Sequence, residues 1–304
     1  MTRAGEETWS VVEASGAPWG ADPARGQRLP EGVVLAGKYV VHRVLGRGSV
    51  STVYLGEQTA LARPVAIKVL ASTFHGSEEH RRLEREAHLL SGLAHESLVR
   101  VYDLGWLALG SGVVVMELLE GETLRERLRR DRWIAPGELI PQIADALDGL
   151  AVVHAARVVH RDLRPGNLFL ATKRGATTLK IIDFGLGRDL ADQQRLTAFG
   201  RVIGTPAYLA PEQLVRGRET DERADLYSMG VTIFEALTGR LPFAGPAHTL
   251  PLRILREEAP RARSLVPELP AALDDVLARA LAKRPEDRYE TADELADALR
   301  RAMG

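Results

Sequence analysis

Apolar residues follow a strand rhythm in the first part of the chain, between residues 38 and about 119. The segments "KYVVHRVLGRGSVSTVYLG" and "PVAIKVL" hold short β-branched runs around a Gly/Ser turn, which predicts three strands. The segment "LGWLALGSGVVVMELLE" predicts a hairpin that turns at Gly110 to Gly112. In "EEHRRLEREAHLLSGL", Leu83, Glu86 and Leu90 share one helical face. This part therefore predicts a small antiparallel sheet with one helix.

Helical spacing dominates the rest of the chain. The segment "PGELIPQIADALDGLAVVHAARVV" predicts a helix with Pro141 in its first turn or at a kink. In "DLYSMGVTIFEALTG" apolar residues surround the helix, so we expect it to be buried on most sides. The segment "NLFLATKRGATTLKIIDFG" predicts a second hairpin that turns near Gly175. Two further helices, near 249–258 and 270–301, complete the expected elements.

These patterns divide the chain into a leader and two lobes. Residues 1–32 mix Gly, Pro and charges without periodicity, which predicts a flexible leader. Trp9 and Trp19 are exceptions, and the sequence leaves open whether they dock on the body, bind a partner or stay disordered. The predicted fold class is α+β. We expect one domain at 33–301, with a sheet lobe at about 33–119 and a mainly helical lobe at about 120–301.

Composition narrows the class of partner. The 40 Lys and Arg residues nearly balance the 41 Asp and Glu residues, which argues against nucleic acid or an anionic membrane as the main partner. The absence of cysteine excludes disulfides and thiolate metal sites. The longest uncharged run, 104–116, contains three glycines and is shorter than the roughly 20 apolar residues that a membrane helix needs. With no secretory signal pattern at the start, a cytoplasmic location is the expectation.

Gly46 and Gly48 lie between two predicted strands, where a bare backbone can approach phosphate oxygens and donate N–H groups. A glycine-rich hairpin turn explains this pair equally well. Ser51 stands where G-x-G-x-x-G has its third glycine, and the segment joins two strands rather than opening a helix. A dinucleotide-binding fold therefore loses its required context.

The strand "VAIK" combines a small residue and a cation. Its period of two places Ala66 and Lys68 on one face. A solvent-facing lysine is the simple interpretation. However, an ammonium beside a small side chain suits a nucleotide whose phosphates lie at the charge. Glu86 on the inward helix face needs a cation, because an unpaired buried carboxylate costs several kcal/mol, and Lys68 is the natural candidate.

The segment "VVHRDLRPGNLFL" places several polar groups between two apolar runs. Asp162 and Asn167 lie five residues apart, and Asp183 follows the "KII" strand. Two oxygen ligands from separate segments suit a partly hydrated Mg²⁺ that also binds phosphates. Asp162 remains available to accept a proton from an attacking hydroxyl. Each residue alone is an ordinary turn residue, but the ordered set is specific.

Taken in order, these motifs resemble the catalytic domain of protein kinases over residues 38 to 301. They are similar to those of the Ser/Thr kinases found widely in bacteria as well as eukaryotes, which implies a two-lobed kinase-like fold. The motifs are "GRGSVSTV", "VAIK", a helical Glu, "HRDLRPGN", "DFG", "GTPAYLAPE" and "DLYSMG".

The resemblance implies a role for each matching residue. Lys68 would hold the α- and β-phosphates of ATP and pair with Glu86, and Asp162 would orient the substrate hydroxyl and accept its proton. Asn167 and Asp183 would hold Mg²⁺. Arg164 stands where Ser/Thr kinases usually carry a Lys that contacts the γ-phosphate, so altered phosphate geometry is expected.

The resemblance also implies the nucleotide site. Met116 would be the gatekeeper, and the backbone of Glu117 and Leu119 would bind adenine. The remaining implied cofactor-binding residues are Leu45, Gly46, Arg47 and Gly48 of the glycine-rich turn, and Val53, Ala66 and Phe169, which would sandwich the base. Structural roles are implied for Asp225, which would brace the catalytic loop, and for Glu212, which would pair with Arg288.

The resemblance implies a Ser/Thr protein kinase that uses Mg·ATP and protein substrates. Arg161 before Asp162 suggests regulation by autophosphorylation of the activation loop, with Thr197 as the hypothesis. Pairing of two copies for phosphorylation in trans stays open. An alternative is a pseudokinase that acts as an ATP-binding scaffold, which only Arg164 and Ser51 support. A small-molecule kinase is disfavoured by "GTPAYLAPE", because that element docks peptide chains.

Overall fold

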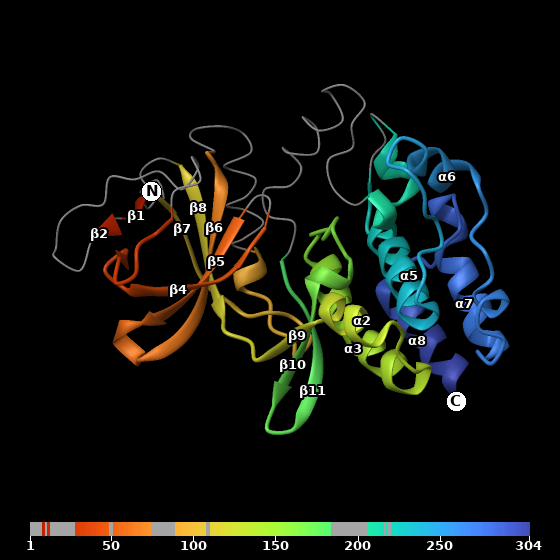
Figure 1. The fold of residues 1–304 in the computed structure, drawn as a ribbon, viewed down its shortest axis with the longest axis horizontal. Helices are drawn as coiled ribbons and strands as arrows, with labels where there is room; N and C mark the ends of the chain where they lie inside the picture. The colour runs from red at the N-terminus through yellow and green to blue at the C-terminus, as the bar shows by residue number, and fades with distance from the viewer. Residues whose placement is uncertain are drawn as a thin grey trace. The chain divides into compact units, whose positions relative to one another are not determined.

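The computed structural model describes residues 8–9, 11–12, 28–48, 51–73, 89–107, 110–183, 206–215, 217 and 220–304. The chain forms two compact units (Figure 1). The first comprises Met1–Leu93 and Val99–Leu119, and the second comprises Ala94–Leu98 and Glu120–Gly304.

Within the described residues, the first unit is built on one eight-stranded sheet with the strand order β1-β7-β8-β6-β5-β4-β3-β2. All recorded pairings are antiparallel except that of β1 with β7. The three predicted strands are confirmed as β4, β5 and β6, and the predicted hairpin is confirmed as β7 with β8. Its turn differs from the prediction, because Ser111 and Gly112 already belong to β8. The strands are β1 (Thr8–Trp9), β2 (Val11–Val12), β3 (Val34–Leu35), β4 (Tyr39–Arg47), β5 (Ser51–Gln58), β6 (Arg63–Thr73), β7 (Val101–Leu107) and β8 (Ser111–Glu117).

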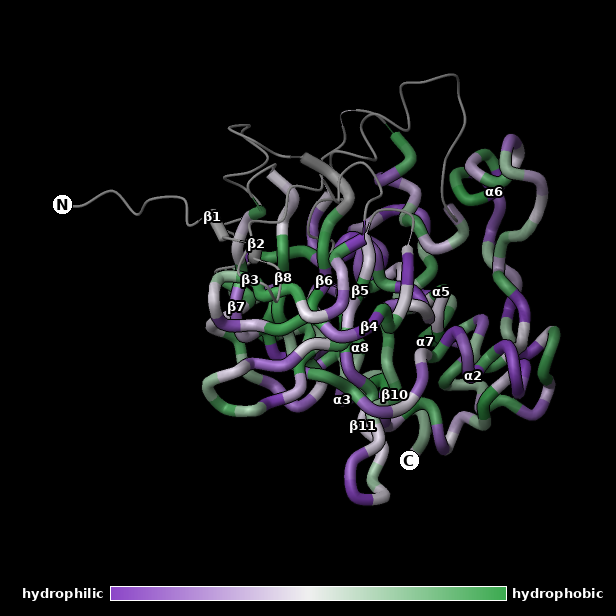
Figure 2. The backbone as a smooth tube through the Cα atoms, turned by 60° about the vertical axis from the view of Figure 1, so that its left-hand side comes forward, coloured by the Kyte–Doolittle hydropathy of each residue, from purple (hydrophilic) through white to green (hydrophobic). Residues whose placement is uncertain are grey.

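The period-two alternation of β6 decides where this sheet buries its apolar side chains. Val65, Ile67 and Val69 lie on one face, within a cluster that also holds Val113 and Val115 of β8. Cross-strand register pairs Ile67 with Val115 and Val69 with Val113, so these side chains share a face. Figure 2 shows the hydrophobic colour along β6 and β8. The other face of β6 is left for Ala66 and Lys68.

The N-terminal segment contributes to this sheet, although the sequence predicts a flexible leader there. Thr8–Trp9 pairs with β7 at one end of the strand order, and Val11–Val12 pairs with β3 at the other end. Only Ser10 separates the two strands in sequence, so the Cα atoms of Trp9 and Val11 lie at most about 7 Å apart and the two edges of the sheet come together. Leu29 is also buried in the core, and its N–H donates to the Tyr54 hydroxyl. These positions of the leader therefore belong to the sheet lobe.

The second unit is mainly helical. The predicted buried helix is confirmed as α5 (Arg223–Thr238), in which all residues from Ala224 to Leu237 except Glu235 are buried. The predicted second hairpin is confirmed as β10 with β11, and its turn residues Arg174 and Gly175 both have positive φ. The other elements are β9 (Gly121–Thr123), β10 (Leu168–Lys173), β11 (Ala176–Ile181), α2 (Leu124–Asp131), α3 (Pro136–Ala155), α6 (Leu250–Arg256), α7 (Ala271–Ala280) and α8 (Ala292–Met303).

Three details differ from the expected helices. The segment 270–301 forms two helices, α7 and α8, because Pro285 and the short turn Pro285–Asp287 interrupt it. In α3, Pro136 occupies the first turn and Pro141 lies further inside the helix. Apolar spacing does not predict α2, which begins at a capping box between Thr123 and Glu126. Among helices in the described part of the chain, none is both long and apolar enough to span a bilayer.

We expect Leu35→Ala to lower the free energy of unfolding by about 2–4 kcal/mol, because it leaves a cavity in the sheet core. Leu35 is 0% exposed, whereas Leu61 is 65% exposed, so Leu61→Ala is the matched control and should change stability by less than about 0.5 kcal/mol. Urea unfolding followed by tryptophan fluorescence measures both. Equally small effects would show that the segment before β4 is not part of the folded lobe.

Candidate active site

The β10–β11 hairpin brings two candidate metal ligands to the same end of a small sheet. Asn167 immediately precedes β10, and its carbonyl accepts a hydrogen bond at 2.9 Å from the N–H of Ile182. Register pairs Leu168 with Ile181, so Asp183 emerges beside Asn167. The hairpin thus explains how residues so far apart in sequence reach one place.

The loop before Asn167 is held by a buried carboxylate in α5. Asp225 is 0% exposed and accepts the N–H of His160 at 2.8 Å and the N–H of Arg161 at 2.7 Å. His154 Nε2 lies 2.9 Å from the same carboxylate. Asp225 stands in the first turn of α5, where the helix dipole favours a negative charge. The predicted bracing of this loop by Asp225 is confirmed.

This anchoring permits an unusual backbone conformation next to Asp162. Arg161 has φ 62°, a left-handed conformation that costs a non-glycine residue of order 1–3 kcal/mol. The hydrogen bond from its N–H to Asp225 holds it there. The N–H of Asp162 in turn donates to His160 Nδ1 at 3.2 Å, and His160 is fully buried. The backbone direction at Asp162 is therefore set by its contacts with the buried residues Asp225 and His160.

Asp162 is oriented by two neighbours from its own loop. The Asn167 amide nitrogen donates to the Asp162 carbonyl at 2.8 Å and also to its carboxylate. Arg164 Nε lies 3.5 Å from Asp162 Oδ2. Arg164, the departure from the usual Lys, is thus placed directly beside the candidate base.

The donor set fits a hard metal ion. Because the Asn167 amide nitrogen makes both bonds to Asp162, its amide oxygen is the group left for a ligand, and no hydrogen bond to that oxygen is recorded within the described residues. Asp183 supplies a second oxygen at the same end of the hairpin. Carboxylate and amide oxygens are ligands that Mg²⁺ prefers. No group of three His, Asp or Glu side chains in the described ranges forms a separate metal site.

Four candidate nucleotide-binding residues share one face of the first unit's sheet. Register places Val53 of β5 opposite Lys68 of β6, and Ala66 opposite Met116 of β8. Directly opposed residues point to the same face, and Ala66 and Lys68 are two apart, so all four lie together. This is the face opposite the Ile67 core. Lys68 is buried at 7% exposure, and its partner predicted from the sequence, Glu86, lies outside the described residues.

The glycine-rich turn leaves room for a ligand. Leu45, Gly46, Arg47 and Gly48 are exposed at the end of β4. A Cβ built on Gly46 would meet no atom within 4 Å among the described residues, so the described fold does not require glycine there. Gly48 donates its N–H to the carbonyl of Ser51 at 2.8 Å. The open space above Gly46 fits the approach of a phosphate group to the bare backbone.

The remaining candidates lie where their elements end or pair. Glu117 closes β8, and it is fixed to Arg100 by two hydrogen bonds of 2.9 Å, one through its N–H and one through its carboxylate. Leu119 is the last residue of the first unit. Phe169 lies in β10, paired with Thr123 of β9 and Lys180 of β11, and is half-buried. Thr197 lies outside the described residues.

A buried ion pair fixes the short turn Pro211–Leu214. The Arg288 guanidinium, 0% exposed, donates to both carboxylate oxygens of Glu212 at 2.7 and 2.8 Å. It also donates to the carbonyls of Arg223, Ala282 and Lys283. The predicted Glu212–Arg288 pair is therefore confirmed.

Two supporting residues escaped the sequence analysis. His154 contacts Asp225 across 71 positions, and Gln213 donates to the carbonyl of Arg161 at 3.4 Å. Gln213 also caps its own turn through the Ala210 N–H. Apolar periodicity does not predict the contacts of His154 and Gln213, because both join segments that are far apart in the sequence.

Comparison with known proteins identifies the family. Residues 39–298 match the family described as "Protein kinase domain". The chain belongs to the protein kinase family. Serine/threonine-protein kinase pkn2 of Myxococcus xanthus is 39% identical over 281 residues, which are 89% of this chain and 33% of that protein. Serine/threonine-protein kinase PknL of Mycobacterium tuberculosis is 39% identical over 270 residues, 88% of this chain and 66% of PknL.

Solved structures agree with the predicted fold class. The crystal structure of the Mycobacterium tuberculosis PknI kinase domain matches with a TM-score of 0.71 and 28% identity, covering 90% of this chain and 100% of that one. The fold class, α+β with a sheet lobe and a helical lobe, is confirmed. This kinase chain spans only part of the curated relatives: a third of pkn2 and about two thirds of PknL.

Replacing Glu212 by Gln should lower the free energy of unfolding by about 3–5 kcal/mol, because Arg288 keeps a buried charge without its carboxylate. The double variant Glu212→Leu/Arg288→Met should recover only part of that loss, because the carbonyls of Arg223, Ala282 and Lys283 then lose their donor. The control is Glu286→Gln in an exposed pair with Arg284, where the side chains are 71% and 53% exposed and the effect should stay below about 1 kcal/mol. Thermal and urea unfolding measure all three, and a Glu212 effect no larger than that of the control would contradict the claim.

Proposed function

We propose that this kinase transfers the γ-phosphate of ATP to Ser or Thr hydroxyls of protein substrates. The observation that carries the proposal is the loop around Asp162, which Asp225 and Asn167 hold from two sides. The Ser/Thr specificity is supported by the names of the relatives and by the segment "GTPAYLAPE".

In this proposal the loop residues act on the hydroxyl and the metal. Asp162 accepts the proton of the attacking hydroxyl, and its carboxylate is kept in position by the amide of Asn167. Asn167 and Asp183 would hold Mg²⁺, which neutralises charge on the phosphates when bound. Arg164, beside Asp162, supplies a fixed positive charge near the transferred group.

The sheet lobe supplies all of the proposed nucleotide-binding residues except Phe169, which belongs to β10 of the second unit. Lys68 would bind the α- and β-phosphates, with Glu86 as its partner. Ala66, Val53 and Phe169 would enclose the base beside the gatekeeper Met116. The backbone groups of Glu117 and Leu119 would bind the adenine edge, and the turn at 45–48 would cover the phosphates. A cytoplasmic location and phosphorylation between two copies remain predictions.

Phosphotransfer should depend on two residues from different lobes. Asp162→Asn removes the proton acceptor and Lys68→Met removes the phosphate-binding cation, so each should lower kcat by about 10²–10⁴-fold. The assay is γ-labelled ATP with Mg²⁺ and a generic protein substrate, followed by phosphoamino-acid analysis. Lys173→Met, an exposed lysine of β10, is the matched control and should keep full activity.

The outcomes separate the alternatives. Phosphoserine or phosphothreonine that disappears in both variants supports the kinase. ATP binding without any transfer by the wild-type chain supports the pseudokinase alternative. Phosphotyrosine alone would overturn the Ser/Thr assignment.

We also propose that autophosphorylation at Thr197 regulates this activity, because Arg161 next to Asp162 offers a cation to a phosphorylated loop. Thr197→Ala should then reduce specific activity by at least about tenfold, as expected when a loop-ordering contact of 1–3 charge-assisted bonds is lost. Mass spectrometry of the purified chain measures the phosphate on residue 197. Thr177→Ala, an exposed threonine of β11, is the control. Unchanged activity of Thr197→Ala would remove the switch.

A further inference from the structure

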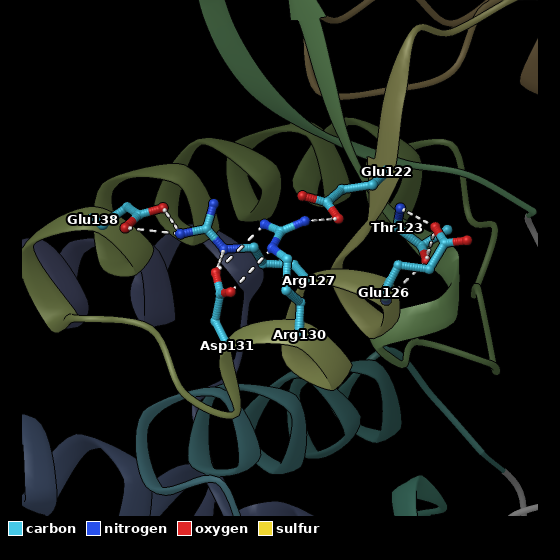
Figure 3. Close-up of polar contacts among 7 residues, drawn as sticks. All are labelled: Glu122, Thr123, Glu126, Arg127, Arg130, Asp131 and Glu138. Carbon is cyan, nitrogen blue, oxygen red and sulfur yellow. Dashed lines mark hydrogen bonds and ion pairs between the residues drawn. The ribbon is translucent and has the colours of Figure 1, made fainter.

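Helix α2 is rich in arginine, and its outward-facing arginines have acidic partners. Arg127 pairs with Asp131 and with Glu138 at 3.1 Å (Figure 3). Arg130 pairs with Glu122 at 2.7 Å and with Asp131 at 3.0 Å. These pairs on one side of the helix form a balanced, solvated surface, which needs no ligand.

Three arginines surround a cavity at the opposite side and the C-terminal end of α2. Arg125 and Arg129 lie on one face of the helix at the spacing i, i+4, and Arg132 is the residue that caps its C-terminus. They line a cavity of about 400 Å³ together with Leu128 of the same helix and with Glu235 and Gly239 from the end of α5. Within the described chain, no ion pair within 4.0 Å involves Arg129 or Arg132. The unpaired guanidinium groups of α2 are therefore those that line this cavity.

Glu235 does not neutralise the cavity, because it is already engaged. Arg125 lies 3.3 Å from Glu235 and donates to the Tyr208 hydroxyl, which itself donates to Glu235. Burial and Glu235 raise the pKa of Tyr208, so this hydroxyl stays neutral. Both α2 and α5 end at the cavity, and each helix C-terminus contributes about −0.5 charge. Three arginines against one carboxylate and two helix ends leave a charge of about +1.

The segment 206–214 connects this cavity with the catalytic loop. At one point Tyr208 bonds Arg125 and Glu235 in the cavity wall. Five residues later, the side chain of Gln213 donates to the carbonyl of Arg161, next to Asp162. The Cα atoms of Tyr208 and Gln213 lie at most about 17 Å apart, because an extended chain spans no more than this in five residues. A peptide whose hydroxyl lies at Asp162 can therefore reach the cavity with a side chain about five residues away.

We propose that the cavity of Arg125, Arg129 and Arg132 binds an acidic side chain of the protein substrate, within about five residues of the phosphorylated Ser or Thr. The inference rests on the proposed kinase function and names the class of substrate that the enzyme prefers. A carboxylate fits between guanidinium groups that lack a partner, since such charge-assisted bonds can be bidentate. Substrates with a basic residue at the same position are disfavoured by like charge.

The test is a set of Ser peptides in which one Glu is moved along each side of the acceptor, with Ala and Lys versions at each position. The wild-type kinase should prefer Glu over Ala at one or two positions by about tenfold in kcat/KM. Arg129→Glu/Arg132→Glu should abolish or reverse that preference while leaving kcat/KM for the all-Ala peptide within about twofold. Arg130→Gln, on the paired side of α2, is the control and should keep the wild-type preference.

The outcomes distinguish this inference from the proposed function. A wild-type enzyme that phosphorylates every peptide without preference for Glu, or a preference that survives in Arg129→Glu/Arg132→Glu, overturns the inference alone. If no peptide is phosphorylated, the proposed function fails. Binding of the Glu and Ala peptides, measured by fluorescence anisotropy, then decides the cavity: equal affinities overturn it, and salt-sensitive tighter binding of the Glu peptide supports it.

Discussion

One buried carboxylate fixes the geometry of the candidate active site. Asp225 lies inside α5 with no exposed surface, and a charge in such a place needs several donors. Two of those donors are backbone N–H groups of the loop that carries Asp162, and a third group is His154. The need to satisfy this carboxylate therefore holds the loop in a conformation that it would not adopt alone. The buried helix α5 thereby determines the backbone conformation of the loop that carries Asp162.

A second constraint acts from the other side of the same loop. The β10–β11 hairpin starts directly after Asn167 and ends two residues before Asp183, so its length and register determine how the two oxygen ligands meet. Asn167 also bonds Asp162, which links the candidate metal ligands to the candidate base. Loop and hairpin thus form one connected unit. A change in the hairpin register would move ligands and base together.

The sequence predicts a structural feature where the apolar periodicity and the residue types of one short segment indicate the same element. Alternation along β6 places Lys68 opposite the core face, and the turn at Gly175 predicts the hairpin. Other features depend on partners distant in sequence. Val11 and Val12 form an isolated apolar pair among Gly and Pro, so only their pairing with β3 makes them a strand. The sequence shows the cap of α2 as Thr123-x-x-Glu126, a signal that apolar spacing does not contain. The arginine cavity appears only when α5 is packed against that helix.

The meeting of the two sheet edges has a consequence for how the isolated lobe behaves. An open sheet presents unpaired N–H and C=O groups along its outer strands, which act as templates for other chains. Here β1 covers β7 and β2 covers β3, using the four residues Thr8, Trp9, Val11 and Val12. A version of the protein trimmed to the family boundary at Tyr39 would lose these cover strands and also Leu29, Val33 and Leu35 of the core. Such a product would expose unpaired N–H and C=O groups on its edge strands, which favours self-association. A recombinant version of the lobe should therefore begin before Thr8.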